Sequence, residues 1–223
     1  MKTIAHIRNG FESKFGIPRQ GGIAKELTSE IIFEKEYRNP EAFRGLDGYS
    51  HIWLIWNFSE SERKSWSPTV RPPRLGGNKR MGVFATRSPF RPNPIGLSAV
   101  KLEEIRNDPK LGMVLVVSGA DLMNGTPIYD IKPYLPEFDS IADASGGFAE
   151  QTSAHTVRVE CRAELEASFP EISAAAKLLL SEDPKPAYLR DLSRIYGMKY
   201  SSHEIKFKYT DSGIAIIDIV KET

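Results

Sequence analysis

The chain has little of what several common classes of protein require. Cys161 is the only cysteine among 223 residues, which excludes an intrachain disulfide and a cysteine-rich metal site. The longest apolar run, residues 52–56, is far below the roughly 20 residues needed to span a bilayer. The first residues alternate polar and apolar and lack the pattern of a signal peptide. We therefore expect a cytoplasmic protein with no membrane segment.

Common nucleotide and metal motifs are also missing. Neither G-x-G-x-x-G nor a P-loop occurs, so a Rossmann site and Walker-type hydrolysis are unsupported. His6, His51, His155 and His203 show no metal-ligand spacing and are expected to be structural, with His51 as the best exception because it opens an apolar strand. Alternation places Cys161 on an apolar strand face. We expect no metal site and no cysteine nucleophile.

The net charge is small, but basic residues are concentrated in one segment. The formal net charge is +1, which argues against a protein that coats nucleic acid by bulk electrostatics. Residues 63–91, however, hold eight basic residues and no acidic one: Arg63, Lys64, Arg71, Arg74, Lys79, Arg80, Arg87 and Arg91. The segment is either a solvated surface loop or a local cationic patch.

The pattern of short apolar stretches predicts a mainly β fold. Alternating or apolar runs predict seven strands, at residues 3–8, 30–35, 49–58, 82–86, 95–105, 111–118 and 128–132. Seven short strands with few helices between them are typical of a barrel or a sandwich. Residues 52–56 are apolar on both faces and predict a central strand. Only residues 39–43, which begin Asn-Pro-Glu, predict a short helix.

A second unit is predicted after a linker rich in Ser, Ala, Gly and Asp at residues 139–153. Residues 157–161 alternate as a strand, and residues 172–180 carry the spacing of one helix face. Residues 205–209 and 214–220 predict a hairpin around Asp211-Ser212-Gly213. We expect an N-terminal mainly β domain, a barrel or a sandwich, over residues 1–140 and a small α+β domain over residues 154–223.

Residues 86–98 form the densest candidate site. Three prolines within six residues make this loop stiff, and Arg87 and Arg91 could fork onto a carboxylate, a phosphate or a carbonyl group. Residues 68–78 repeat the same chemistry with Arg71 and Arg74. The alternative is a loop that only braces the barrel, although loops of this length commonly carry function.

Other loops offer complementary groups. Asp121 follows a β run, so its carboxylate lies at a strand end. There it either accepts hydrogen bonds from an ammonium or ribose group of a ligand, or it only forms an Asx turn. Residues 18–22 are a weaker candidate of similar composition. Residues 183–190 form a stiff basic loop in which Tyr188 could stack on a base while Lys185 and Arg190 reach phosphates.

Together these loops resemble the signatures of the TsaA-like family. The resemblance lies in residues 70–77, 82–88, 90–96 and 130–134 and extends over about residues 4–139, and the loop at 183–188 resembles an element of the longer two-domain members. Members act as tRNA (N6-threonylcarbamoyladenosine) methyltransferases. The resemblance implies a closed β-barrel with a small α+β C-terminal domain, a homodimer, and S-adenosylmethionine bound near the subunit interface.

The resemblance also implies which residues act. Cofactor contacts are expected from Pro18, Arg19, Gln20, Ser59, Glu60, Arg87, Leu97, Asp121, Leu122, Met123 and Asn124. Contacts with tRNA are expected from Lys185, Tyr188 and Arg190, and Arg71, Arg74 and Arg91 are candidates to clamp the threonyl carboxylate of the substrate.

The accepting N6 is urea-like and must lose its proton during attack, but no residue stands out as the general base. Two alternatives stay open: a non-catalytic tRNA-binding module and a module that senses S-adenosylmethionine without transferring its methyl group.

Overall fold

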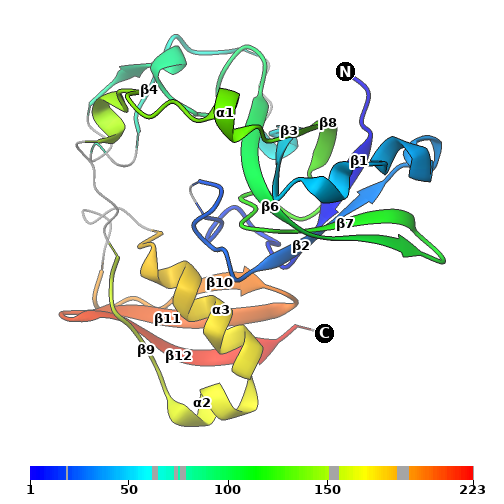
Figure 1. Cartoon of the computed structure of the whole chain (residues 1–223). Helices are drawn as coiled ribbons and strands as arrows, with labels where there is room; N and C mark the ends of the chain where they lie inside the picture. Colours follow the sequence, from blue (N-terminus) through cyan, green and yellow to red (C-terminus); the bar gives the residue numbers. More distant parts are fainter. Residues whose placement is uncertain are drawn as a thin grey trace.

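Six antiparallel strands close into a barrel in the N-terminal part of the chain, as a computed structural model shows (Figure 1). The structure describes residues 1–18, 20–61, 65–72, 75, 79–150, 156–184 and 191–222. The barrel order is β1-β2-β7-β6-β3-β8, formed by β1 (Ala5–Arg8), β2 (Thr28–Phe33), β3 (His51–Asn57), β6 (Ile95–Asp108), β7 (Gly112–Ser118) and β8 (Pro127–Pro133). The predicted mainly β, closed-barrel fold is confirmed.

Side-chain alternation fills the barrel. Ile52, Leu54 and Trp56 on β3 are buried in one core with residues of the other barrel strands, such as Val100 and Leu115. Strand β3 pairs with β6 on one side and β8 on the other, so the expectation of a central strand is confirmed. The outer face of β3 is partly covered, because Trp53 donates a 2.9 Å hydrogen bond from Nε1 to the carboxylate of Asp139.

The prediction of a strand at residues 82–86 is wrong. Only Met81–Gly82 form a strand, β5, which pairs with β4 (Thr69–Val70) outside the barrel. Residues Val83–Ala85 form the 3-10 turn η6. The backbone N–H and the hydroxyl of Thr86 both donate to the carbonyl of Val83, which closes this turn in place of a strand ladder.

Short helices lie between the barrel strands and after the last of them. The expected helix at 39–43 is the 3-10 turn η2 (Pro40–Phe43), capped by the Asn39 side chain, which accepts from the N–H of Glu41. The other short helices are η1 (Lys35–Tyr37), η3 (Leu46–Gly48), η4 (Ser59–Ser61), α1 (Pro136–Asp139) and η7 (Gly147–Ala149). In the described part of the chain, no helix combines the length and the apolar character that a bilayer crossing requires.

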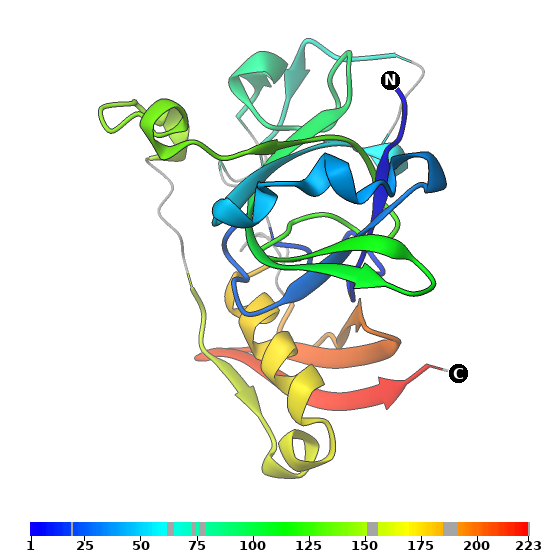
Figure 2. The ribbon, with the colours of Figure 1, turned by 45° about the vertical axis from the view of Figure 1, so that its right-hand side comes forward.

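The C-terminal unit is a four-stranded sheet with helices. Its strand order is β10-β11-β12-β9, and β9 runs parallel to β12. The elements are β9 (Val159–Cys161), α2 (Ala163–Ser168), α3 (Pro170–Ser181), β10 (Tyr196–Tyr200), β11 (His203–Thr210) and β12 (Gly213–Lys221). Figure 2 shows α3 lying along this sheet. The predicted hairpin and helix are confirmed, whereas α2 and β10 carried no clear periodic signal.

Residues 9–27, here called the strap, join the two units. Phe11 and Ala24 are buried in the core of the C-terminal unit, and Phe15 and Ile17 pack against that core. The ring of Phe15 stacks on that of Phe207, with centroids 6.1 Å apart. In both ribbon views the strap passes between the barrel and the sheet (Figures 1 and 2). The core of the second unit is therefore not confined to residues 154–223.

A glycine in the strap tests this packing. Gly16 has φ of +90°, and a Cβ atom there would lie 2.3 Å from Sδ of the buried Met198. We expect Gly16→Ala to lower the free energy of unfolding by roughly 2 to 4 kcal/mol, from backbone strain and overpacking, in urea denaturation. Gly48→Ala, where no heavy atom lies within 4 Å, is the control and should be nearly neutral. Equal midpoints for both variants would contradict this packing.

Candidate functional site

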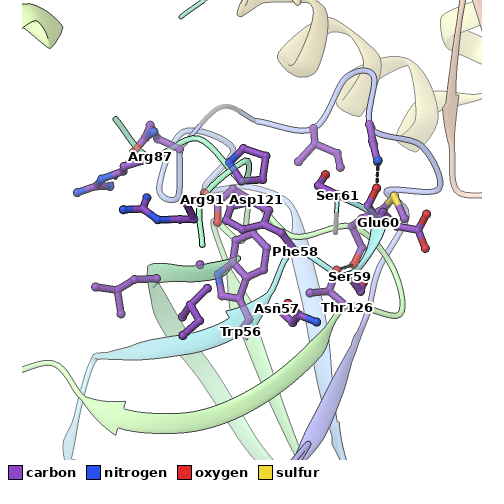
Figure 3. A pocket seen from close by; sticks show the side chains of 18 of the residues that line it. Trp56, Asn57, Phe58, Ser59, Glu60, Ser61, Arg87, Arg91, Asp121 and Thr126 are labelled. Atoms are coloured by element: carbon purple, nitrogen blue, oxygen red, sulfur yellow. Dashed lines mark hydrogen bonds between the residues drawn. The ribbon is translucent and has the colours of Figure 1, made fainter. Parts of the chain in front are cut away.

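A cavity of about 710 Å³ opens at one end of the barrel (Figure 3). Its walls come from four segments: the strap, the end of β3 with the following turn, the proline-rich loop with the start of β6, and the chain between β7 and β8. Its volume lies within the range of small-molecule sites, roughly 300 to 1,000 Å³. In Figure 3, Arg87 and Arg91 lie on one side of the pocket and Ser59, Glu60 and Ser61 on the other.

A chain of hydrogen bonds runs from the barrel interior to the pocket. Trp56 donates from Nε1 to Oγ of Ser98 at 3.0 Å, and Ser98 donates from the same oxygen to Oδ1 of Asp121 at 2.5 Å. Trp56 and Ser98 are buried, whereas Asp121 is partly exposed to the cavity. Because both donors are fixed by packing, the carboxylate is held in one orientation before any ligand binds.

The carboxyl group of Asp121 is electrostatically unusual. Burial raises its pKa above the ordinary aspartate value, while the Ser98 hydroxyl, backbone N–H groups including that of Gly21, and the charge of Arg87 act in the opposite direction. Burial disfavours the charged form, and a partly buried carboxylate in a cleft is a common feature of ligand sites. A cationic ligand group would relieve this cost.

Local backbone features aim Trp56 into the site. The pairing of β3 with β8 shifts register between Ile55 and Trp56, and bulges of this kind redirect side chains beside functional sites. On the neighbouring strand, a Cβ at Gly96 would lie 2.2 Å from the indole ring. Only glycine allows the ring to lie this close to β6. Trp56 and Phe58, with ring centroids 4.2 Å apart, form an apolar wall.

Three basic residues line the cavity, Lys14, Arg87 and Arg91, here called the basic rim, and each is held in place by a hydrogen bond. Arg87 donates from Nη1 to Oε1 of Gln20 at 2.7 Å, which links the proline-rich loop to the strap. Arg91 donates to the carbonyl of Thr86 at 3.2 Å within its own loop. Lys14 of the strap donates from Nζ to the backbone carbonyl of Glu60. The rim therefore carries oriented donors facing a carboxylate.

The structure brings most of the expected site residues together. Nine of them line the cavity: Pro18, Gln20, Ser59, Glu60, Arg87, Arg91, Leu97, Asp121 and Met123. Leu122 instead packs fully buried in the barrel core, and its carbonyl accepts from the amide of Asn9. Asn124 is exposed, and its side chain accepts from the N–H of Asn9. Leu122 and Asn124 are not among the lining residues.

Other expected residues lie away from the cavity or outside the described residues. Arg71 is exposed at the end of β4 and does not line the cavity. The expected residues outside the described ranges are Arg19, Arg74, Lys185, Tyr188 and Arg190. Among the described residues there is no group of three or more metal-ligating side chains. His51, the best exception among the histidines, is exposed; its Nδ1 lies 2.9 Å from Oγ of Ser50, and its ring lies beside that of Tyr134.

Several pocket residues were missed from the sequence. Lys14, Trp56, Phe58 and Gly96 line the cavity, and Ser98 supports its carboxylate. Ser98 alone carried a usable signal, because it is a polar residue at an inward position of an apolar strand, between Gly96 and Val100. Such a residue requires a hydrogen-bond partner inside the barrel.

Comparison with known proteins gives a consistent result over the whole chain. A family model described as the tRNA-methyltransferase O N-terminal domain matches residues 6–140, and one described as the TrmO C-terminal domain matches residues 152–222. A protein of Escherichia coli K12 named tRNA (adenine(37)-N6)-methyltransferase is 40% identical over 224 residues, covering 96% of this chain and 95% of the relative.

Two proteins of Pseudomonas aeruginosa extend the comparison. One carries the name "Putative S-adenosylmethionine-dependent methyltransferase RcsF" and is 35% identical over 217 residues, covering 94% of this chain and 92% of its own length. The other is a crystal structure of TrmO, which superposes with a TM-score of 0.78 at 31% identity and covers 98% of this chain and 95% of the solved one.

The burial of Asp121 predicts a pH dependence of stability. Below about pH 3.9, the pKa of aspartate in an unfolded chain, the carboxyl group is neutral in both states. As pH rises through the higher folded-state pKa, the folded protein must hold a charge that burial disfavours, and stability is lost. Asp121→Asn removes this charge, so its stability relative to wild type should increase between acidic and neutral pH. Urea unfolding across that range measures the difference, and a flat difference would contradict the burial argument.

Proposed function

The chain belongs to the tRNA-methyltransferase O family, and from that premise we propose that it transfers a methyl group from S-adenosylmethionine to N6 of adenosine 37 in tRNA. We propose further that the accepting base carries the threonylcarbamoyl group. The observation that carries the proposal is that eight of the eleven residues assigned to the cofactor by family resemblance line one cavity.

The donor set of the cavity fits S-adenosylmethionine. When bound, the cofactor supplies a methyl group on a positively charged sulfur. The ligand also carries an ammonium group, a carboxylate, a ribose and a flat adenine ring. The cavity offers the carboxylate of Asp121, the guanidinium of Arg87, and the apolar wall of Trp56 and Phe58. Each of these groups suits one part of the ligand by charge or shape.

The roles of Asp121 and Arg87 follow from charge. Asp121 accepts hydrogen bonds from the ammonium or ribose group, because a cationic or hydrogen-bond-donating partner lowers the cost of burying its carboxylate. Arg87 binds a carboxylate or an adenine edge of the cofactor. Its hydrogen bond to Gln20 orients the guanidinium group at the wall of the cavity. Placing a guanidinium against the positively charged sulfur would instead repel it. The two residues therefore fix the two ends of the ligand.

The acceptor side of the site is assigned to basic residues. Arg91 lines the cavity and is oriented by the carbonyl of Thr86, so its remaining donors can fork onto the threonyl carboxylate of the substrate. Arg74 belongs to the same acid-free segment and is proposed to support this contact, whereas Arg71 does not line the cavity and is assigned no part in it. Holding the two reacting atoms about 3 to 3.5 Å apart is the main source of acceleration in such a transfer.

The remaining parts of the proposal concern partners. Lys185, Tyr188 and Arg190 are proposed to contact tRNA, the protein to act as a homodimer with its cofactor near the subunit interface, and the reaction to take place in the cytoplasm. The family membership and the tRNA-directed name of the Escherichia coli relative support the tRNA substrate.

Methyl incorporation tests the proposed activity. The chain is incubated with radiolabelled S-adenosylmethionine and tRNA prepared with or without the threonylcarbamoyl group. We expect label only in the tRNA that carries the group. Cofactor binding without incorporation would indicate a sensing module, and tRNA binding with no cofactor uptake in calorimetry would indicate a binding module; either result overturns the proposal.

Arg91→Ala tests the clamp. Losing a charged, forked contact should lower kcat/KM for the threonylcarbamoylated tRNA by roughly 10- to 150-fold, which corresponds to about 1.5 to 3 kcal/mol. Affinity for S-adenosylmethionine should stay near the wild-type value, because the proposed contact is with the acceptor. Arg91→Lys keeps the charge but loses the forked geometry, so its kcat/KM should lie between those of the wild type and of Arg91→Ala. Unchanged turnover in the alanine variant would remove Arg91 from the site.

A further inference from the structure

Two aromatic rings stand exposed on the outside of the barrel. Trp66 is 51% exposed and Phe84 is 72% exposed, and their rings stack with centroids 6.0 Å apart and planes 29° from parallel. Trp66 precedes β4 and Phe84 lies in η6, directly after β5. A single exposed aromatic residue needs no explanation, but two rings stacked in water form an apolar face that a ligand could cover.

The described residues 65–72 and 79–86, here called the β4–β5 arm, surround these rings with positive charge. Arg71, Lys79 and Arg80 are exposed and form no ion pair with any other described residue. Arg80 is oriented by a 3.0 Å hydrogen bond from Nη1 to Oγ1 of Thr69. The sequence from residue 63 to residue 102 contains no aspartate or glutamate. The arm therefore presents aromatic faces within an uncompensated cationic field.

The combination of exposed aromatic rings and unpaired basic side chains indicates which class of partner the arm binds. Exposed rings beside unpaired cations bind single-stranded nucleic acid, because bases stack on the rings while the cations contact phosphates. A second copy of this chain is a poorer match, since packing the arm on itself would bring like charges together. The arm is also close to the cavity along the chain, because Phe84 lies three residues before the rim residue Arg87.

We propose that Trp66 and Phe84 form a stacking platform for an unpaired base of the tRNA anticodon loop next to the methylated adenosine. The proposal rests on the proposed function and deepens it. An adenosine that enters the cavity must leave its stack, and its neighbour then loses a stacking partner. The platform replaces that partner, while Arg71, Lys79 and Arg80 contact the adjacent phosphates.

Titration with an anticodon stem-loop RNA carrying threonylcarbamoyladenosine tests the platform. Trp66→Ala and Phe84→Ala should each weaken RNA binding about 5- to 150-fold, the usual range for one stacked base. Affinity for S-adenosylmethionine should not change, which shows that each variant is folded. Trp66→Phe and Phe84→Tyr keep a ring and should bind nearly as wild type. Phe138→Ala, which removes a ring that is also 72% exposed but lies in α1, is the matched control.

The outcomes separate this proposal from the function on which it rests. RNA affinity within twofold of wild type for the Trp66→Ala, Phe84→Ala double variant would overturn the platform even if methyl transfer is observed. If the wild type sediments as a dimer and the double variant as a monomer, the platform would be overturned too, because the rings would then join two copies of the chain. If the wild-type chain binds the RNA through these rings but transfers no methyl group, the platform stands and the proposed function fails.

Discussion

The hydrogen bond from Ser98 to Asp121 connects the packing of the barrel to the chemistry of its open end. The barrel interior is filled by apolar side chains such as Leu54 and Val100 up to the level of Trp56. Above that level the inward positions become polar, and the indole N–H, the Ser98 hydroxyl and the Asp121 carboxylate satisfy one another. A buried carboxylate is costly unless it is bonded, so the position of these groups depends on the whole core beneath them.

The strap places a second constraint on the same cavity. Its apolar residues Phe11 and Phe15 belong to the core of the C-terminal unit, whereas its residues Pro18 and Gln20 form a wall of the cavity. One short segment therefore serves two packing environments at once. A displacement of the C-terminal sheet would move that wall and the Gln20 partner of Arg87 with it. The C-terminal unit thus contributes to the shape of the cavity, although none of its described residues after position 150 lines it.

Local patterns predicted the fold better than they predicted the site. The continuous apolar run of β3 and the hairpin of β11 and β12 are short-range features, and they were correctly predicted. Residues 82–86 contain a short apolar run like that of a strand, but the Thr86 hydroxyl closes a 3-10 turn there, which such a run cannot reveal. The role of Trp56 was missed because it depends on a register shift against β8 and on Gly96 across the sheet. Such features are set by strand pairing between distant segments.

The site residues expected from family resemblance also divide into those that local sequence fixes and those that depend on the path of the backbone. Residues in stiff or strand-end positions, such as Arg87 and Asp121, line the cavity, because proline and strand geometry fix their direction. Leu122 and Asn124 flank Met123, yet one faces the barrel core and the other faces outward. Residues two apart share a face only in an extended strand, and here the chain turns at Asn124 and Gly125. A motif therefore identifies a segment, and only the path of the backbone decides which of its side chains face the ligand.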